Sequence, residues 1–291
     1  MIAGLLMIAG GVGAGMFGSL LGLGGGILIV PLLTLGFGLP LREAAAVSLV
    51  AVIVTSSAAA SVYLQRHTAN LRLGMSLELF TAIGALLGGL IAFTLSDRIL
   101  AGLFSVLLAY TAFTMARRRD APPAPAAIPA VAPALADPAT ALPEPAATGR
   151  LGGLSSVDTL AGLSGAGYRV RNLGRGIVGA FFAGIVSAVL GVGGGIVKVP
   201  VMHLVMGVPL RIATATSNLM IGVTATASAI VYVMRGGMDP YVVGPIAVGV
   251  FIGASVGSRV APRVNVPVRR ILFVVVMVYT ALQMVLRTVA G

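Results

Sequence analysis

Long apolar runs, separated by short polar or charged stretches, dominate the chain. The runs cover roughly residues 1–36, 43–65, 74–95 and 99–116, and then 175–206, 211–234, 241–262 and 269–288. About 20 apolar residues are enough for a helix to cross the hydrocarbon core of a bilayer. The pattern therefore predicts an all-α polytopic membrane protein surrounded by lipid.

Glycines interrupt the first run of each group of four. The interruptions read Gly22-Leu23-Gly24-Gly25-Gly26 and Gly191-Val192-Gly193-Gly194-Gly195, and Pro31 and Pro200 follow them. Inside a bilayer, backbone groups freed from a helix need a partner from the protein, from water or from a ligand. We therefore expect each interruption to form a Gly-broken re-entrant hairpin and part of a binding site.

The two groups of four runs are copies of one another. Pro31 and Pro200 define an offset (200 − 31 = 169) that matches further residues without a gap. The matched pairs include Pro40 with Pro209, Arg42 with Arg211, Ser48 with Ser217, Gly84 with Gly253 and Tyr110 with Tyr279. Interrupted apolar segments in matching places of two halves indicate the binding site of a secondary transporter.

A stretch of different composition separates the copies. Residues 121–147 are almost wholly Ala and Pro, which favour extended conformations and cannot bury a core. We expect a first transmembrane repeat at 1–116, a cytoplasmic Ala/Pro-rich linker at 117–174 and a second transmembrane repeat at 175–291.

Arginine clusters predict how the copies are oriented in the cytoplasmic (inner) membrane. Arg117–Arg119 and Arg175 flank the linker, and Arg259 to Arg270 surround the connection between the last two runs. The positive-inside rule places both regions in the cytoplasm. Each repeat then has three transmembrane helices plus its hairpin, the two repeats have inverted topology, and both termini lie outside. A parallel duplication, the alternative, would need the last cluster outside.

Composition excludes several classes of function. The chain is 58% hydrophobic and 9% charged, and it has a mean hydropathy of +1.05, two histidines and no cysteine. Its net charge of +11 comes from arginines between the runs, without the interleaved aromatic residues of nucleic-acid modules. We therefore expect no nucleic-acid partner, no metal and no cofactor. The sequence also has no paired intramembrane carboxylates, Ser/His/Asp set or nucleotide-binding motif that would indicate an enzyme.

The doubled glycine elements carry a family resemblance. Each reads Gly-x-Gly-Gly-Gly-Ile, leads to a proline and is followed by a Gly-x-Pro-Leu-Arg turn. In these features the chain resembles the sulfite exporter TauE/SafE family of membrane permeases, from about Gly15 to Tyr110 and from about Ala180 to Tyr279. The resemblance implies transport of small sulfur-containing or organic anions, such as sulfite, sulfoacetate or related sulfonates.

The two breaks are the first candidate for the solute site. Helix N-termini at a break offer free N–H groups and partial positive charge near the middle of the membrane, which suits an anion. We expect the solute to bind between the breaks and to move by alternating access, with proton or sodium coupling both open, as is the oligomeric state. The candidate residues here are Gly24, Gly25, Gly26, Gly193, Gly194 and Gly195.

Lys198 is the only lysine, and it lies in the second broken segment where the first copy has Ile29. An ammonium at that depth costs at least about 2.5–3.5 kcal/mol on insertion scales. Three arrangements would accommodate it: reaching the cytoplasmic interface, facing the anion, or forming an internal ion pair. His203 follows on the same arm, either as a packing residue or as a group that binds the anion or carries a proton.

Small polar residues follow each Pro-Leu-Arg turn. Ser48 and Ser217 recur at the matched position, and Asn218 is the costliest of the group to bury without a partner, so we expect these three to line the solute cavity. Many such side chains bond only to their own helix. Glu78 lies one turn into its helix, where the interface and the positive helix end favour a carboxylate, with a coupling proton as the alternative.

Two other functions stay open: a cation-coupled permease for another small solute, and a membrane assembly protein that transports nothing. A cation carrier is disfavoured because neither break contains an acidic residue. A carboxylate close to Lys198 would count in its favour.

Overall fold

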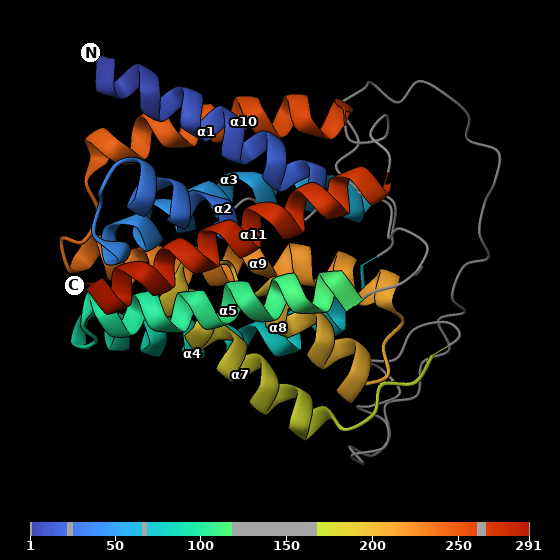
Figure 1. The fold of residues 1–291 in the computed structure, drawn as a ribbon. Coiled ribbons are helices and arrows are strands. Elements are labelled where there is room, and N and C mark those ends of the chain that lie inside the picture. Colours follow the sequence, from blue (N-terminus) through green and yellow to red (C-terminus); the bar gives the residue numbers. More distant parts are fainter. Residues whose placement is uncertain (1, 22–25, 66–68, 118–167, 261–265, 291) are drawn as a thin grey trace.

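The computed structural model describes residues 2–21, 26–65, 69–117, 168–260 and 266–290, and its elements there are helices (Figure 1). The first copy contains α1 (Ile2–Leu21), α2 (Gly26–Pro31), η1 (Leu32–Gly36), α3 (Leu41–Gln65), α4 (Leu71–Thr94) and α5 (Asp97–Arg117). The second copy contains α7 (Leu173–Leu190), α8 (Gly195–Pro200), η2 (Val201–Val205), α9 (Leu210–Met234), α10 (Pro240–Val260) and α11 (Val266–Ala290). The predicted interruptions fall between α1 and α2 and between α7 and α8.

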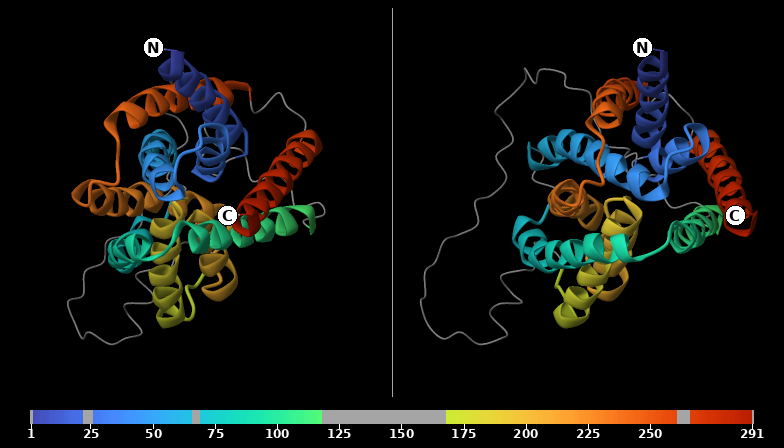
Figure 2. Two further views of the ribbon diagram at one scale, coloured as in Figure 1. Left: turned by 60° about the vertical axis from the view of Figure 1, so that its left-hand side comes forward. Right: turned by 90° about the vertical axis from the view of Figure 1, so that its left-hand side faces the viewer.

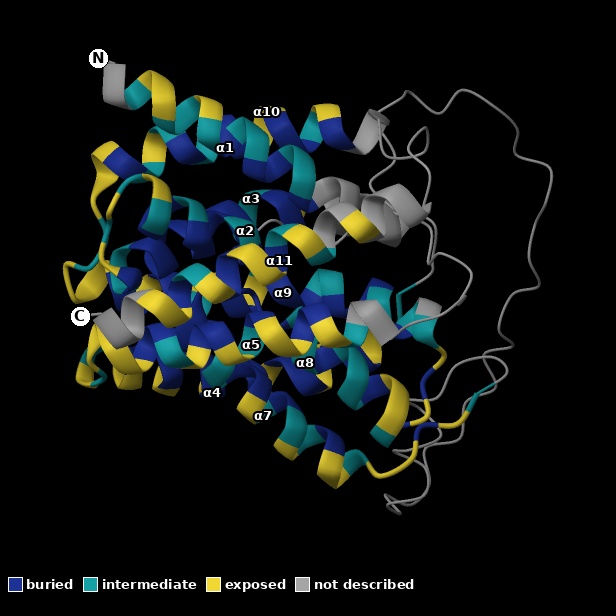
Figure 3. Cartoon of the chain, viewed as in Figure 1, coloured by how far each residue is buried: buried dark blue, intermediate teal, exposed yellow. Residues whose placement is uncertain are grey.

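The outer surface of the helices is apolar. Within the described part of the chain, 5 helices are long and apolar enough to cross a membrane, in α4, α5, α7, α9 and α10. Large apolar residues on them are exposed, among them Met75 at 71% and Val106 at 68%. Figure 3 shows exposed positions along these helices. Exposure of such an apolar surface to water is unfavourable, whereas contact with lipid is not. The all-α polytopic membrane class is therefore confirmed.

The two copies interlock. Helix α1 packs along α10 and α7 packs along α4, while α3 lies against α9 and α5 against α11. Figure 2 shows α1 beside α10 and α5 beside α11 from two further directions. Exchanging the copies leaves this set of neighbours unchanged, so the helices are related by an approximate two-fold.

Glycines allow the closest of these crossings. A Cβ atom added to Gly84 of α4 would lie 2.1 Å from the carbonyl oxygen of Phe181 in α7. A Cβ added to Gly253 of α10 would lie 2.1 Å from the carbonyl oxygen of Val12 in α1. Gly253 and Val12 match Gly84 and Phe181 at the repeat offset, so the same close helix packing occurs at both crossings.

The ends of the helices lie on two opposite sides of the body. In Figure 1, α1 begins and α11 ends on the left, whereas α5 ends and α7 begins on the right. The two ends of the linker are therefore on the side opposite to the first and last helix ends.

The crossing of α4 and α7 predicts a sharp effect of one methyl group. Gly84→Ala would push a Cβ onto the Phe181 carbonyl, and such overpacking typically costs about 1–3 kcal/mol. We expect a lower melting temperature for the purified protein in detergent. Gly102→Ala is the matched control, because a Cβ at Gly102 of α5 meets nothing within 4 Å. Equal melting temperatures for the two variants would contradict the packing argument.

Candidate functional site

The second broken segment folds back on itself as a helical hairpin, and the described part of the first packs in a similar way. In the second copy, the Arg171 N–H donates to the Met206 carbonyl (3.0 Å), and the Met206 side chain covers Gly176 near the start of α7. In the first copy, the side chains of Leu32 and Phe37 lie against Gly10 of α1. The glycine break is the tip of the second hairpin, and Gly191–Gly194 there are buried, whereas residues 22–25 of the first break lie outside the described residues.

The second tip needs glycine for two reasons. Gly191, Gly193 and Gly194 have φ values of 69°, 80° and 72°, in the left-handed region that glycine adopts at no steric cost. Space is also short, because a Cβ at Gly193 would lie 2.7 Å from Val52 of α3 and 2.8 Å from Ile221 of α9. Val52 and Ile221 are matched residues of the two copies, so the tip lies where α3 and α9 meet.

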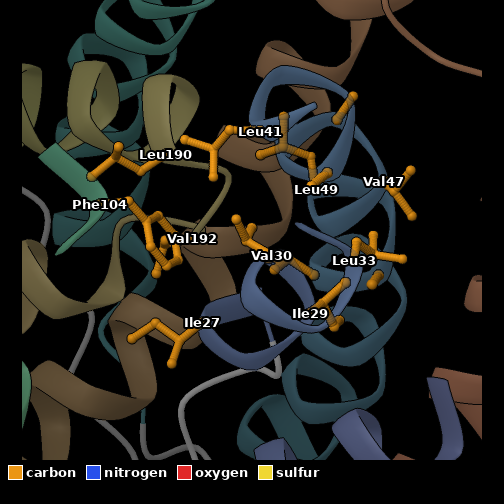
Figure 4. Close-up of a cluster of buried hydrophobic side chains, with 14 of the residues drawn as sticks. Ile27, Ile29, Val30, Leu33, Leu41, Val47, Leu49, Phe104, Leu190 and Val192 are labelled. Carbon is orange, nitrogen blue, oxygen red and sulfur yellow. The ribbon is translucent and has the colours of Figure 1, made fainter. Parts of the chain in front are cut away.

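Ser48 joins the two breaks. Its hydroxyl, on α3, lies 3.0 Å from the carbonyl oxygen of Gly26, which begins α2, and 2.7 Å from that of Gly191, which follows α7. The side chain is fully buried. Ile27 and Val30 of α2 share an apolar cluster with Val192 of the second tip (Figure 4). The two breaks, far apart in sequence, therefore meet at one hydroxyl.

Two buried hydroxyls beside the second break lack a partner. Ser217 of α9, the match of Ser48, is 1% exposed, and Ser187 of α7 is 0% exposed; neither has a hydrogen-bond partner in the described part of the chain. A Cβ at Gly195 would lie 3.7 Å from Ser217 Oγ, and one at Gly194 would lie 3.4 Å from Ser187 Oγ. An unsatisfied buried hydroxyl costs about 1–3 kcal/mol. An acceptor oxygen of a ligand within hydrogen-bonding distance would satisfy either hydroxyl.

Lys198 forms an internal ion pair. Its Nζ atom lies 3.1 Å from Glu78 Oε2 and donates to Thr224 Oγ1 at 2.5 Å. Thr224 in turn donates to Glu78 Oε1 at 2.6 Å. The lysine side chain is 1% exposed and the glutamate side chain 11%. Of the three arrangements considered for Lys198, the structure has the ion pair, which links α8 and α9 of the second copy to α4 of the first.

The prediction of an interfacial Glu78 was wrong. Its carboxylate is buried between α8 and α9 because Lys198 and Thr224 supply the partners that an interface would otherwise supply. A signal for this existed in the sequence: one acid and one lysine, each alone in an apolar run, are expected to pair in a bilayer. Thr224 gave a weaker signal, because many polar side chains of membrane helices bond only to their own backbone.

The remaining predicted site residues lie at different depths. Asn218 is half-buried on α9 next to Ser217, while Gly24 and Gly25 lie outside the described residues. His203 is exposed in η2, and its Nδ1 lies 2.9 Å from the Val208 carbonyl oxygen, at the open end of the hairpin and away from the tip. The structure thus brings together Gly26, Ser48, Gly193–Gly195 and Ser217, with Lys198 one turn further along α8. Among the described residues, no group of three or more His, Asp or Glu could hold a metal ion.

Comparison with known proteins identifies the family. The family model "Sulfite exporter TauE/SafE" matches residues 7–284, which run from within α1 to within α11 and include both broken segments. The chain belongs to the TauE/SafE family. A relative, the "Probable membrane transporter protein YunE" of Bacillus subtilis (strain 168), is 22% identical over 267 residues, which are 88% of this chain and 88% of that protein. No solved structure matches the chain.

Membership confirms the resemblance seen in the glycine elements. TauE/SafE proteins are a family of membrane transporters, so the chain is a multi-pass membrane protein of a transporter family that handles small solutes in a lipid environment. In this TauE/SafE chain the matched region contains Ser48, Ser217, Glu78 and Lys198.

The ion pair of this TauE/SafE protein predicts a strong coupling between two substitutions. Lys198→Met alone leaves the Glu78 charge buried without its partner, which typically costs about 3–5 kcal/mol. Lys198→Met combined with Glu78→Met removes both charges and is expected to recover most of that loss. Melting temperatures of the wild type, both single variants and the double variant in detergent complete the cycle. Additive losses would show that the two charges do not stabilise each other.

Proposed function

We propose that the protein is a secondary transporter that moves small sulfur-containing or organic anions, such as sulfite, sulfoacetate or related sulfonates, across the cytoplasmic membrane. The observation that carries this proposal is the meeting of both breaks at Ser48, with the buried hydroxyls of Ser187 and Ser217 unpaired beside them. Sulfite and sulfonate groups present acceptor oxygens in a compact cluster, which fits several converging O–H and N–H donors. The family description names sulfite.

The charges near the second tip favour recognition of an anion by hydrogen-bond donors rather than by an unpaired cationic side chain. Lys198 is a cationic side chain one turn beyond the second tip, and the Glu78 carboxylate at 3.1 Å offsets its charge. Recognition of an anion in this state therefore rests on the Ser187 and Ser217 hydroxyls and on backbone N–H groups at the break, as in other helix-break sites. Lys198 becomes a solute ligand once Glu78 releases it.

The proposal includes two repeats of inverted topology that rock around this site. Two observations support this arrangement. The set of helix contacts stays the same when the two copies are exchanged, and the end of α5 and the start of α7 lie on the side opposite to the start of α1 and the end of α11. The arginine clusters support a cytoplasmic linker and termini outside. Each hairpin then acts as a re-entrant element, one from each side. Because Gly191–Gly194 are buried, the solute enters when a hairpin moves against α3 and α9, as alternating access requires.

A cation-coupled permease is the second candidate, and Glu78 favours it because it places a carboxylate beside Lys198. That carboxylate already has an ammonium partner, and a second cation beside it would be repelled by Lys198 in a medium of low dielectric constant. The pair is therefore a poor sodium site while it is intact.

Flux through reconstituted protein tests the proposal. We expect the wild type in proteoliposomes to take up radiolabelled sulfite, sulfoacetate or both. Ser217→Ala is expected to reduce uptake about tenfold, because a hydrogen bond to a charged group contributes about 1.5–3 kcal/mol and each 1.4 kcal/mol is tenfold. The melting temperature should not fall, since the Ser217 hydroxyl has no partner in the described part of the protein.

Ser105→Ala provides the matched control for this experiment. The Ser105 hydroxyl lies on α5 and donates to the Gly102 carbonyl of its own helix at 2.7 Å, so its loss should leave uptake unchanged. Absence of flux for both anions in the wild type would overturn the proposed function. Equal uptake by Ser217→Ala and Ser105→Ala would remove Ser217 from the site.

A further inference from the structure

We propose that Glu78, Lys198 and Thr224 form the proton-coupling site of this transporter: Glu78 takes up one proton as Lys198 leaves it to pair with the bound anion. The inference rests on the proposed function, and it assigns the coupling ion and the residues that carry it. The three side chains form a closed set of hydrogen bonds at 3.1, 2.5 and 2.6 Å.

The cluster lies next to the solute site along two elements. Ser217, Ile221 and Thr224 are spaced four and three residues apart on α9 and so share one face of that helix, which puts Thr224 about 10 Å beyond Ser217 at 1.5 Å per residue. Ile221 contacts the tip at Gly193 and Gly195. On the hairpin itself, Lys198 is one turn from Gly195, and its flexible four-carbon stem allows the ammonium to turn toward the tip.

The charges balance when both ions bind together. In the structure, the Lys198 ammonium and the Glu78 carboxylate sum to zero. One anionic group of the solute, its sulfonate, pairs with Lys198, and the proton from the aqueous side forms an O–H bond on a Glu78 carboxylate oxygen. The Lys198 ammonium, the protonated Glu78 and this sulfonate again sum to zero, while the carboxylate of a dianion such as sulfoacetate lies outside this balance. Either ion alone would leave a buried charge without a partner, which is costly inside a bilayer and so ties the two ions together.

Thr224 suits both states of Glu78. Its hydroxyl now accepts from Lys198 and donates to Glu78 Oε1. A hydroxyl has one donor and two acceptor sites and rotates freely, so it continues to bond a protonated carboxyl after Lys198 has left. Thr224 therefore prevents Glu78 from losing all of its partners when the ion pair opens.

The fold does not require an ion pair at this joint. At the equivalent joint of the first hairpin, Ile29 takes the place of Lys198, and Ala247 of α10 in the second copy takes the place of Glu78; Ile29 is fully buried. Thr224 corresponds to Thr55, whose hydroxyl lies 3.1 Å from the carbonyl oxygens of Ala51 and Val52 in its own helix. Apolar packing thus closes the equivalent joint, and the charged pair is an addition specific to the second hairpin.

Other titratable groups of the neighbouring elements lie at helix ends. Within the described residues, the ion pair between Lys198 and Glu78 is the one salt bridge recorded, and the other charged groups on these elements are exposed or part-buried near a helix end. They are Arg72 of α4, Arg175 of α7, His203 of η2, Arg42 and Glu43 of α3, and Arg235 after α9, while the Arg211 side chain at the start of α9 lies outside the described part. Glu78 is therefore the carboxylate through which a proton would act at this depth.

Two transport assays separate coupling from transport. Both measure uptake of radiolabelled sulfoacetate into proteoliposomes whose membrane potential is clamped at zero. The first assay measures counterflow without a pH gradient, and the second measures accumulation when the interior is one pH unit more alkaline than the exterior. For one proton per anion, the wild type should accumulate sulfoacetate about tenfold. Glu78→Gln keeps the shape of the side chain and cannot take up the proton. It should retain counterflow and show no accumulation driven by the gradient.

Glu43→Gln, at the start of α3 and away from the pair, is the matched control and should behave as the wild type. Gradient-driven accumulation by Glu78→Gln equal to that of Glu43→Gln would overturn the coupling site while leaving the transporter intact. Loss of counterflow in the wild type would instead overturn the proposed function, and the coupling with it.

A measurement on the wild type alone guards against a Glu78→Gln variant that fails to fold. Binding of sulfoacetate to purified protein in weakly buffered detergent solution should take up about one proton per bound anion, read from a pH-sensitive dye. No proton uptake during saturable binding would contradict the proposal.

Discussion

A helix that stops inside a bilayer leaves backbone groups that lipid cannot satisfy, and most of this structure is arranged around two such stops. The tips of both hairpins are held by protein: Ser48 reaches the carbonyls of Gly26 and Gly191, and Val52 and Ile221 close on Gly193 from the two copies. To bring the tips together, α1 and α7 must lie close to α10 and α4. The glycines at those crossings make that approach possible. The same constraint explains why Ser187 and Ser217 stand out, because among the described residues they are the buried hydroxyls that this arrangement leaves unpaired.

The backbone is repeated, whereas the chemistry of the two hairpins differs. Matching helices make matching contacts, yet the joint at the first hairpin has Ile29 where the joint at the second hairpin has Lys198, which pairs with Glu78 and Thr224. A symmetric pair of hairpins suits a site that opens in turn to each side, and one charged joint suits a movement tied to a second ion. In our proposal, the duplicated hairpins move to open the site to each side in turn. The charged pair, which the first hairpin lacks, couples this movement to a proton.

Much of the fold could be predicted because apolar periodicity and the exact repeat offset report directly on helices in lipid. Each apolar run contains a helix near its expected bounds, and the second glycine break falls where Gly191–Gly195 and Pro200 indicated. The site was harder to predict. The role of Ser48 at the site depends on its hydrogen bond to the carbonyl of Gly191, which is far away in sequence. The partner of Lys198 likewise comes from the other copy. No local pattern encodes either contact. His203 looked equivalent to Lys198 along the chain, but the length of the hairpin arm places it at the opposite end from the tip.

The most direct test of the central claim, that the solute binds where the two breaks meet, uses the absence of cysteine from the chain. Ser217→Cys introduces one thiol at the buried, unpaired hydroxyl, and its rate of labelling by a membrane-impermeant maleimide can be measured with and without sulfoacetate. The account predicts labelling that occurs as the protein opens and slows as sulfoacetate saturates the site, while Ser105→Cys on α5 shows no protection. Labelling of Ser217→Cys at the same rate with and without sulfoacetate would contradict it.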